Sequence, residues 1–350
     1  MKIVFLNKEL EKKYDDFLLK SENTLFYASS KYRKLLKEFL KTEDYYFVAL
    51  DDKNQILGVL PSFIKRNKKF GNVLNSLPFY GSNGAIIEHN NNITVRQNLI
   101  YSFYSFAQKQ NCISTNIITN PFEKDVSFYE KNTNYTFIDK RIGQLTELQI
   151  DKNFIEEDLM KKFDSVRRRN IKKAQKHNIK VINDEKGEYT NFLIETHTQN
   201  IKSIGGIPKP KSYFDTIESV LEYNKDYKIF VGLMNNIPIA SLLLVYFNKT
   251  VEYFIPAIKE EYRTFQPLSL IILEAMKDAV FSGYKWWNWG GTWLTQDGVY
   301  KFKKRWGTED KLYYYFINIF DKKIFNFTRK QLLEEYPFFY VLPFDKLKSK

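Results

Sequence analysis

The predicted secondary structure elements occur in the same order in both halves of the chain. Segments 47–50 and 56–60 are apolar and flank a short polar stretch, a pattern that predicts a β-hairpin. Segments 230–233 and 237–247 flank a polar turn in the same way. One such hairpin in each half predicts two related units rather than a single continuous domain.

Each predicted hairpin is followed by a strand, a helix and a further strand. In the first half these segments are 73–77, 95–110 and 113–118, and in the second they are 251–255, 267–280 and 286–289. The sequence therefore predicts an α/β (α+β) fold of two fused domains, each with a mixed, mostly antiparallel sheet and helices. We assign residues 1–150 to the first domain, and residues 151–350 to a helical connector and the second domain.

The composition limits the kinds of protein to which this chain can belong. The 350-residue chain is 43% hydrophobic and 17% aromatic, which supports a sizeable core. Cys112 is the sole cysteine, and the histidines are scattered at 89, 177 and 197, so neither a disulfide nor a metal site is expected. No apolar run reaches the roughly 20 residues that cross a bilayer, and the start resembles no signal peptide. We therefore expect a cytoplasmic protein.

The net charge of +13 is concentrated between the two halves. The connector 153–177 has apolar positions Phe154, Leu159, Phe163 and Val166, typical of a helix that packs on a core. From Ser165 to Asn183 the chain has no acidic residue, and its cations are Arg167, Arg168, Arg169, Lys172, Lys173, Lys176 and Lys180. This run is either a phosphate-binding surface, whose cations stay exposed, or an ordinary solvated face. It also supports an alternative function, that of a non-catalytic nucleic-acid-binding protein.

Tryptophan and glycine gather in segment 286–293, and cations follow in segment 301–305. The predicted strand places Trp289, Gly290 and Gly291 at its C-terminal end, where open α/β sheets bind ligands. The segment thus predicts a functional site, although large aromatic residues also serve as core packing.

Three patches resemble the FemAB-like branch of the GNAT acyltransferase superfamily: Leu77–Gly84, Val166–Ala174 and Phe254–Gly307. The resemblance implies two fused GNAT-like domains. It also implies transfer of an acyl or aminoacyl group to an amine of a cell-envelope precursor. A peptidoglycan peptide and an amino sugar of polysaccharide biosynthesis are both open as acceptors, free or lipid-linked, and contact with the inner face of the membrane is a further expectation. No stable protein partner is expected.

The donor stays open between acyl-CoA and aminoacyl-tRNA, used as a co-substrate without a tightly bound cofactor. Where GNAT enzymes place a glycine-rich loop, this chain has Gln266 and Leu268 in place of glycines, and Pro267 has no N–H to give. That departure argues against the usual coenzyme A pose, whereas the basic run suits tRNA. The residues expected to bind the donor are Arg263, Gln266, Arg169, Lys172, Trp289, Gly290 and Phe302.

The resemblance implies that Lys303, in a Phe-Lys motif, is the central catalytic residue, because a fixed cation stabilises developing negative charge. Asp297 is a candidate base, although Asp-Gly is also a common turn pair. Glu252 and Tyr253 are further candidates, and strand alternation allows only one of them to face the cleft. Tyr80, Asn83 and Gly84 are expected to bind the acceptor.

Overall fold

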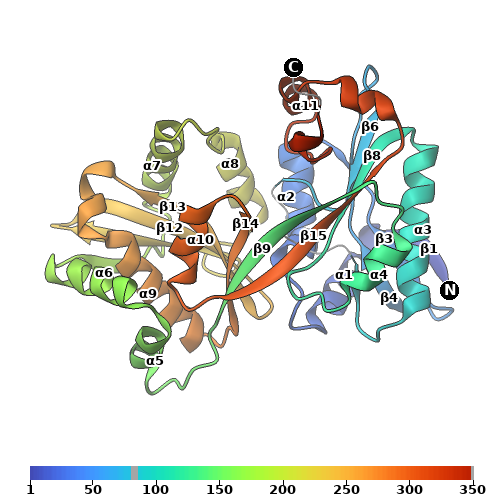
Figure 1. Cartoon of the computed structure of the whole chain (residues 1–350). Coiled ribbons are helices and arrows are strands. Elements are labelled where there is room, and N and C mark those ends of the chain that lie inside the picture. Colours follow the sequence, from blue (N-terminus) through green and yellow to red (C-terminus); the bar gives the residue numbers. More distant parts are fainter. Residues whose placement is uncertain (80–85, 348–350) are drawn as a thin grey trace. The chain divides into compact units, whose positions relative to one another are not determined.

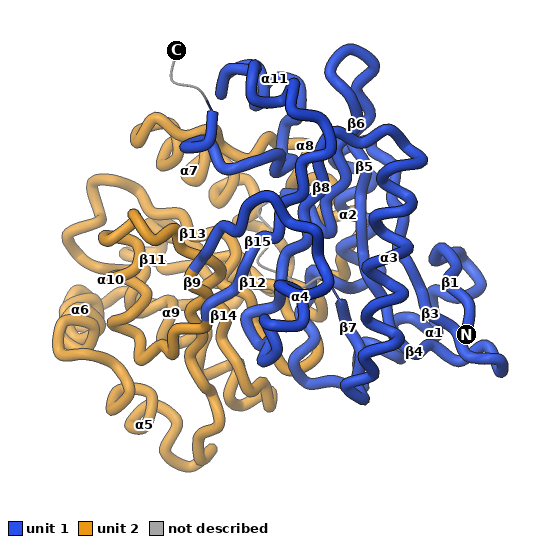
Figure 2. The backbone as a smooth tube through the Cα atoms, turned by 45° about the vertical axis from the view of Figure 1, so that its right-hand side comes forward, with its two compact units in different colours: residues 1–141, 312–350 blue, residues 142–311 orange. Residues whose placement is uncertain are grey.

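The computed structural model describes residues 1–79 and 86–347, which form two compact units. The first unit comprises residues 1–141 and the segment from Leu312 onwards, and the second comprises residues 142–311 (Figure 2). Tyr80, Asn83 and Gly84 lie outside the described residues.

The first unit holds most of the short strands (Figure 1). Its elements are β1 (Lys2–Phe5), α1 (Lys8–Leu19), η1 (Phe26–Ala28), α2 (Ser30–Leu40), β2 (Glu43–Asp44), β3 (Phe47–Leu50), β4 (Ile56–Leu60), β5 (Phe63–Lys65), β6 (Asn72–Asn75), β7 (Ile87–Glu88), α3 (Ile93–Lys109), β8 (Cys112–Ile118), α4 (Val126–Asn132), η3 (Lys322–Asn326), α11 (Arg329–Glu335) and η4 (Phe344–Lys346). By sequence, β9 (Phe137–Glu147) begins in this unit and β15 (Glu309–Ile319) ends in it.

The second unit holds the longer strands and most of the basic helices. Its elements are α5 (Ile155–Lys162), α6 (Ser165–Lys176), β10 (Lys180–Asn183), α7 (Thr190–Ser203), α8 (Lys211–Val220), β11 (Tyr227–Met234), β12 (Ile237–Phe247), β13 (Thr250–Ile258), η2 (Glu260–Phe265), α9 (Pro267–Phe281), β14 (Trp286–Trp293) and α10 (Asp297–Lys304).

The predicted hairpins are confirmed, and the repeat extends further than predicted. β3 pairs antiparallel with β4, and β11 pairs antiparallel with β12. In each unit a strand and two helices precede the hairpin, as β1, α1 and α2 in the first and β10, α7 and α8 in the second. In each unit the strand–helix–strand that follows forms a parallel pair, β6 with β8 and β13 with β14. The fold is α+β, with mixed, mostly antiparallel sheets.

The units differ where Pro61 and Ser62 interrupt a strand. In the second unit β12 pairs along its length with both β11 and β13. In the first unit β4 pairs with β3, whereas β5, which follows Ser62, pairs with β6 and β2. Proline has no N–H for a ladder, so an interruption is expected at this position. The corresponding strand is thereby divided between two sheets.

The connector is two helices rather than one. α5 ends before Phe163, and α6 begins after Asp164, whose Oδ1 accepts a hydrogen bond from Arg167 N at 2.8 Å as a helix N-cap. Leu159 and Phe163 are buried as predicted. Phe154 is 53% exposed, so its assignment to the apolar face was wrong: it precedes α5 as its N-cap.

The C-terminal segment packs differently from the sequence-based boundary. Residues 312–350 were assigned with the second domain, but β15 pairs antiparallel with β8, with Tyr315 opposite Ile118. Ile324 is fully buried in a cluster that also contains Val73. Strand pairing and this cluster therefore place the segment with the first unit. The assignment of residues 1–150 and 151–350 to two functional domains stays a prediction.

Candidate functional site

The parallel pair of β13 and β14 ends at Glu252 and Asn288. Beyond this point Gly290 has a φ of +72°, a left-handed conformation that favours glycine. Its N–H donates to Asn288 Oδ1 at 2.9 Å. The strand continues to Trp293, so Gly290 forms a kink inside β14, where the sequence predicted the C-terminal end of the strand.

Lys303, on α10, reaches this kink. Its Nζ donates to Thr292 Oγ1 at 2.9 Å, to Gly291 O at 3.1 Å and to Gly290 O at 3.4 Å. These acceptors match the three donors of an ammonium group. The residue is only 7% exposed, and this burial lowers the pKa of Lys303 to about 8, because removal from water disfavours the charged form.

A buried amide extends the network around Lys303. Thr292 Oγ1 donates to Gln144 Oε1 at 3.2 Å, which leaves the hydroxyl lone pairs free to accept from Lys303. Gln144 Nε2 donates to Tyr300 O and Thr308 Oγ1, both at 3.3 Å. Sequence reasoning missed Gln144 and Thr292, because no local pattern links strand β9 to α10.

Aromatic rings pack beside the kink. Trp289 stacks on Trp306 with ring centres 5.5 Å apart, and meets Phe302 edge-on at 6.1 Å. Its Nε1 donates to Thr146 Oγ1 at 3.0 Å. Trp289 is 2% exposed, so it packs inside the unit. Phe302 is half-buried.

Arg167 is the buried member of the basic run. Its guanidinium carbon lies 4.6 Å from the ring centre of Phe302 and 5.5 Å from that of Trp306, and the residue is 7% exposed. Burial, and then the nearby Arg305, lowers the pKa of Arg167. The prediction that Arg167 belongs to an exposed positive surface was wrong, because Phe302 of α10 and Trp306, which follows this helix, pack against its guanidinium.

Three of the other predicted donor residues are exposed on the surface of the second unit. Arg169 and Lys172 are exposed on α6, and Arg263 is exposed on η2. Asn170 Nδ2 donates to Gln266 Oε1 at 2.9 Å, which ties α6 to the start of α9. Gln266 has a φ of +61° and Pro267 is the first residue of the helix, so no glycine-rich loop precedes the N-terminus of α9.

Alternation along β13 separates the candidate bases. Tyr253 lies 4.9 Å from Trp289 between ring centres, on the face that carries the aromatic residues. Burial raises the pKa of Tyr253, so its phenol stays protonated. Glu252 is 1% exposed and pairs in register with Asn288 on the other face. Asp297 is exposed as the first residue of α10, so the alternative of an Asp-Gly turn does not hold: the pair starts a helix.

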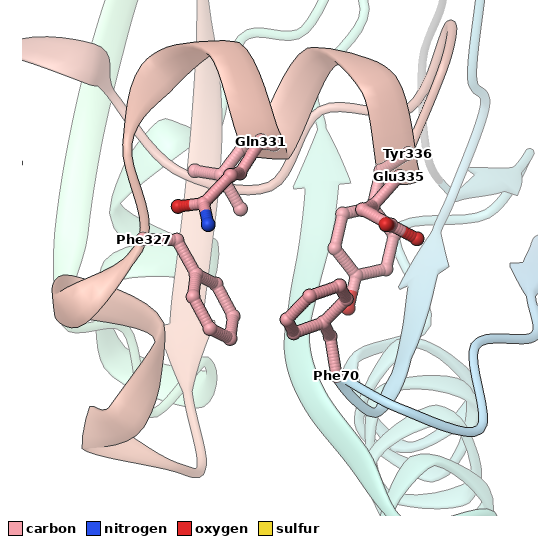
Figure 3. Close-up of a pocket in the computed structure, with 6 residues that line it drawn as sticks. Phe70, Phe327, Gln331, Glu335 and Tyr336 are labelled. Carbon is pink, nitrogen blue, oxygen red and sulfur yellow. The ribbon is translucent and has the colours of Figure 1, made fainter.

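A small hollow, partly open to solvent, lies in the first unit and is lined by Phe70, Phe327, Gln331, Leu332, Glu335 and Tyr336 (Figure 3). Phe70 and Phe327 meet edge-on at it, with ring centres 4.8 Å apart (Figure 3). It holds no enclosed space for a water-sized molecule, whereas ligand sites typically hold about 300 Å³ or more. None of the predicted site residues lines it.

Within residues 1–79 and 86–347, no cluster of three or more His, Cys, Asp or Glu side chains could hold a metal ion. In the same part of the chain, no helix combines the length and apolar character needed to cross a membrane.

Residues 209–311 match the model of the FemAB family, a segment that includes β13, β14 and α10. No curated protein matches the chain. Among solved structures, FemX is similar over 93% of this chain and 99% of its own, with a TM-score of 0.75 and 14% identity. L-PGS from Bacillus licheniformis is similar over 96% and 98%, with a TM-score of 0.57 and 9% identity.

A tandem GNAT protein from the clavulanic acid biosynthesis pathway is similar over 90% of this chain and 97% of its own, with a TM-score of 0.52 and 10% identity. At such identities the structural likeness concerns the fold, and it agrees with the repeat of elements in the two units. The family match covers the segment that contains Lys303. The chain therefore resembles the FemAB family over residues 209–311, and it shares the fold of FemX and of a tandem GNAT protein.

Proposed function

We propose that the chain is an N-acyltransferase that moves an aminoacyl or acyl group from an activated donor to an amine of a cell-envelope precursor. The amine nitrogen bonds to the donor carbonyl carbon, the bond from that carbon to the carrier breaks, and a base takes one amine proton. The observation that carries the proposal is the buried ammonium of Lys303 at the Gly290 kink.

Lys303 is suited to stabilise the oxyanion of this reaction. A positive charge in a buried environment acts more strongly on developing negative charge than one in water. Its contact with Gly290 O, at 3.4 Å, is the longest of its contacts. An oxyanion that replaces this acceptor would gain a charge-assisted hydrogen bond without moving the other two.

Aminoacyl-tRNA is the donor we favour. The start of α9, with Gln266 and Pro267, offers fewer backbone amides to a pyrophosphate than a glycine-rich loop does. Arg169 and Lys172 are exposed beside it and suit a polyanionic donor. Transfer of an aminoacyl group also agrees with the match of residues 209–311 to the FemAB family.

The remaining site residues have proposed roles. Tyr253 holds a protonated phenol near the aromatic residues, so it acts as a hydrogen-bond donor rather than as the base. Asp297, exposed on α10, remains a candidate base. Tyr80, Asn83 and Gly84 remain candidates for binding an amino sugar or a peptidoglycan peptide.

Substitution of Lys303 tests the proposal. Lys303→Ala should lower kcat by about 10² or more, the scale of losing one electrostatic stabiliser. Lys301→Ala is the matched control, since Lys301 is an exposed lysine of the same helix. Transfer is measured with aminoacyl-tRNA and with acyl-CoA, against an amino sugar and a peptidoglycan peptide. Wild-type turnover by a folded Lys303→Ala enzyme would remove Lys303 from the mechanism.

A further inference from the structure

Arg167 is a buried cation whose charge the described residues leave without a direct ion pair. Its Nε is buried with no hydrogen-bond partner, and within residues 1–79 and 86–347 no carboxylate forms an ion pair with it. Asp164, whose charge acts on Arg167, is engaged elsewhere: Oδ1 accepts from the Arg167 backbone N–H, and Oδ2 lies 3.5 Å from Arg305 Nε.

An arginine in this position cannot relieve the cost of burial by losing its proton, because the guanidinium stays charged at every physiological pH. The rings of Phe302 and Trp306 offset part of that cost through cation–π contacts. They leave the buried Nε–H, which lies in the plane of the guanidinium, without an acceptor. A bound anion would satisfy both the charge and this donor.

The surroundings favour phosphate as this anion. Arg305 lies close enough to add to the positive potential, and Arg169 and Lys172 are exposed on the same helix. A guanidinium fork matches two oxygens of a phosphate group. Phe302, which Arg167 contacts, directly precedes Lys303, so an anion held here would be bound next to the reacting segment.

We infer that Arg167 binds a phosphate group of the activated donor, held between α6 and α10. The inference rests on the proposed function and adds a donor contact that the exposed part of the basic run does not supply. Phosphate is common to both candidate donors: tRNA carries it in its backbone and coenzyme A in its pyrophosphate.

The test compares Arg167→Met with wild type. Methionine keeps an apolar side chain on the two rings and removes the charge. The unliganded variant should unfold at the wild-type temperature or above it, because replacing an unpaired buried charge by an apolar group is neutral or stabilising. Its Kd for the donor that the wild type binds should rise about 10-fold or more. The probes are deacylated tRNA and coenzyme A, and binding is measured by titration at low salt, where electrostatic effects are largest.

Lys202→Met is the matched control, since Lys202 is an exposed cation on α7, outside the basic run. Its Kd should change by about 2-fold or less, the scale of one screened surface charge. Arg167→Lys keeps the charge without the planar fork, so it should bind with intermediate affinity. If Arg167→Met fails to fold, the Kd of Arg167→Lys decides whether Arg167 binds the phosphate.

Wild-type affinity of folded Arg167→Met or Arg167→Lys for both probes would overturn the inference and leave Arg167 as a packing residue. If Lys303→Ala abolishes transfer in that case, the proposed function stands while the inference falls. If the wild type binds neither tRNA nor coenzyme A, the proposed donor chemistry itself fails. The probe whose binding Arg167→Met loses identifies the donor.

Discussion

Lys303 combines a buried position with a pKa of about 8, and this separates two roles for it. An ammonium that stabilises an oxyanion is lost as the pH rises through that value, whereas a base becomes active there. Arginine at the same position keeps its proton throughout. We predict that the ratio of wild-type kcat to Lys303→Arg kcat is constant below about pH 7 and falls above about pH 8.

The ratio is the useful quantity because both enzymes use the same amine, so the acceptor's own titration cancels. It is measured from transfer rates at saturating donor and acceptor across the pH range. A ratio that climbs with pH would instead assign Lys303 the role of base.

At the level of single residues, the sequence predicted Lys303 but not what holds it. The Phe-Lys motif is local, so it can be recognised in one stretch of chain. The acceptors for its ammonium come from Thr292 and the Gly290 kink, and Gln144 supports them from β9. Arg167 was misjudged for the same reason, since its burial depends on rings that only the folded chain brings to it.

Helix α10 is the element that the sequence described least well. Asp297 and Gly298 match a turn pair, yet they form its first residues. The two interpretations differ in what Gly298→Ala should do. In a helix the change should stabilise the protein by about 0.5–1 kcal/mol, because alanine loses less backbone entropy than glycine. A Cβ at Gly298 would meet nothing within 4 Å, so no clash opposes this gain.

Chemical denaturation of the wild type and Gly298→Ala checks this expectation. Gly307→Ala is the contrasting variant: Gly307 has a φ of +70°, and an added Cβ would lie 2.7 Å from Lys162 O, so it should destabilise the protein. If Gly298→Ala instead destabilises the protein, Asp297 and Gly298 form a turn and not the start of a helix.

Elements with their own local signals were predicted more fully. The hairpins and α9 follow from alternation, polar turns and helical periodicity, which need no tertiary context. The break between α5 and α6 depends on Asp164 acting as an N-cap, a signal hidden by the apolar residues around it. The division of a strand at Pro61 likewise cannot be predicted without knowing that a second sheet takes up the residues that follow.

At the scale of the whole molecule, each unit contains a strand, two helices, a hairpin and a parallel strand–helix–strand in the same order. The repeat was predictable because each unit carries its own local pattern. The placement of residues 312–350 was not, because it follows from the pairing of β15 with β8, which are distant in sequence.

Deletion of residues 312–350 tests that placement. The deletion removes the β15 residues that pair with β8, and also Leu332, which packs with Ile113 of β8. We predict that β8 loses its protection from amide hydrogen exchange while α9 retains it, because α9 packs within residues 142–311. Leu332→Ala is the milder form of the change and should cost about 2–5 kcal/mol, since Leu332 is 2% exposed. If exchange instead accelerates in α9 and not in β8, residues 312–350 stabilise the second domain, as a boundary at residue 150 requires.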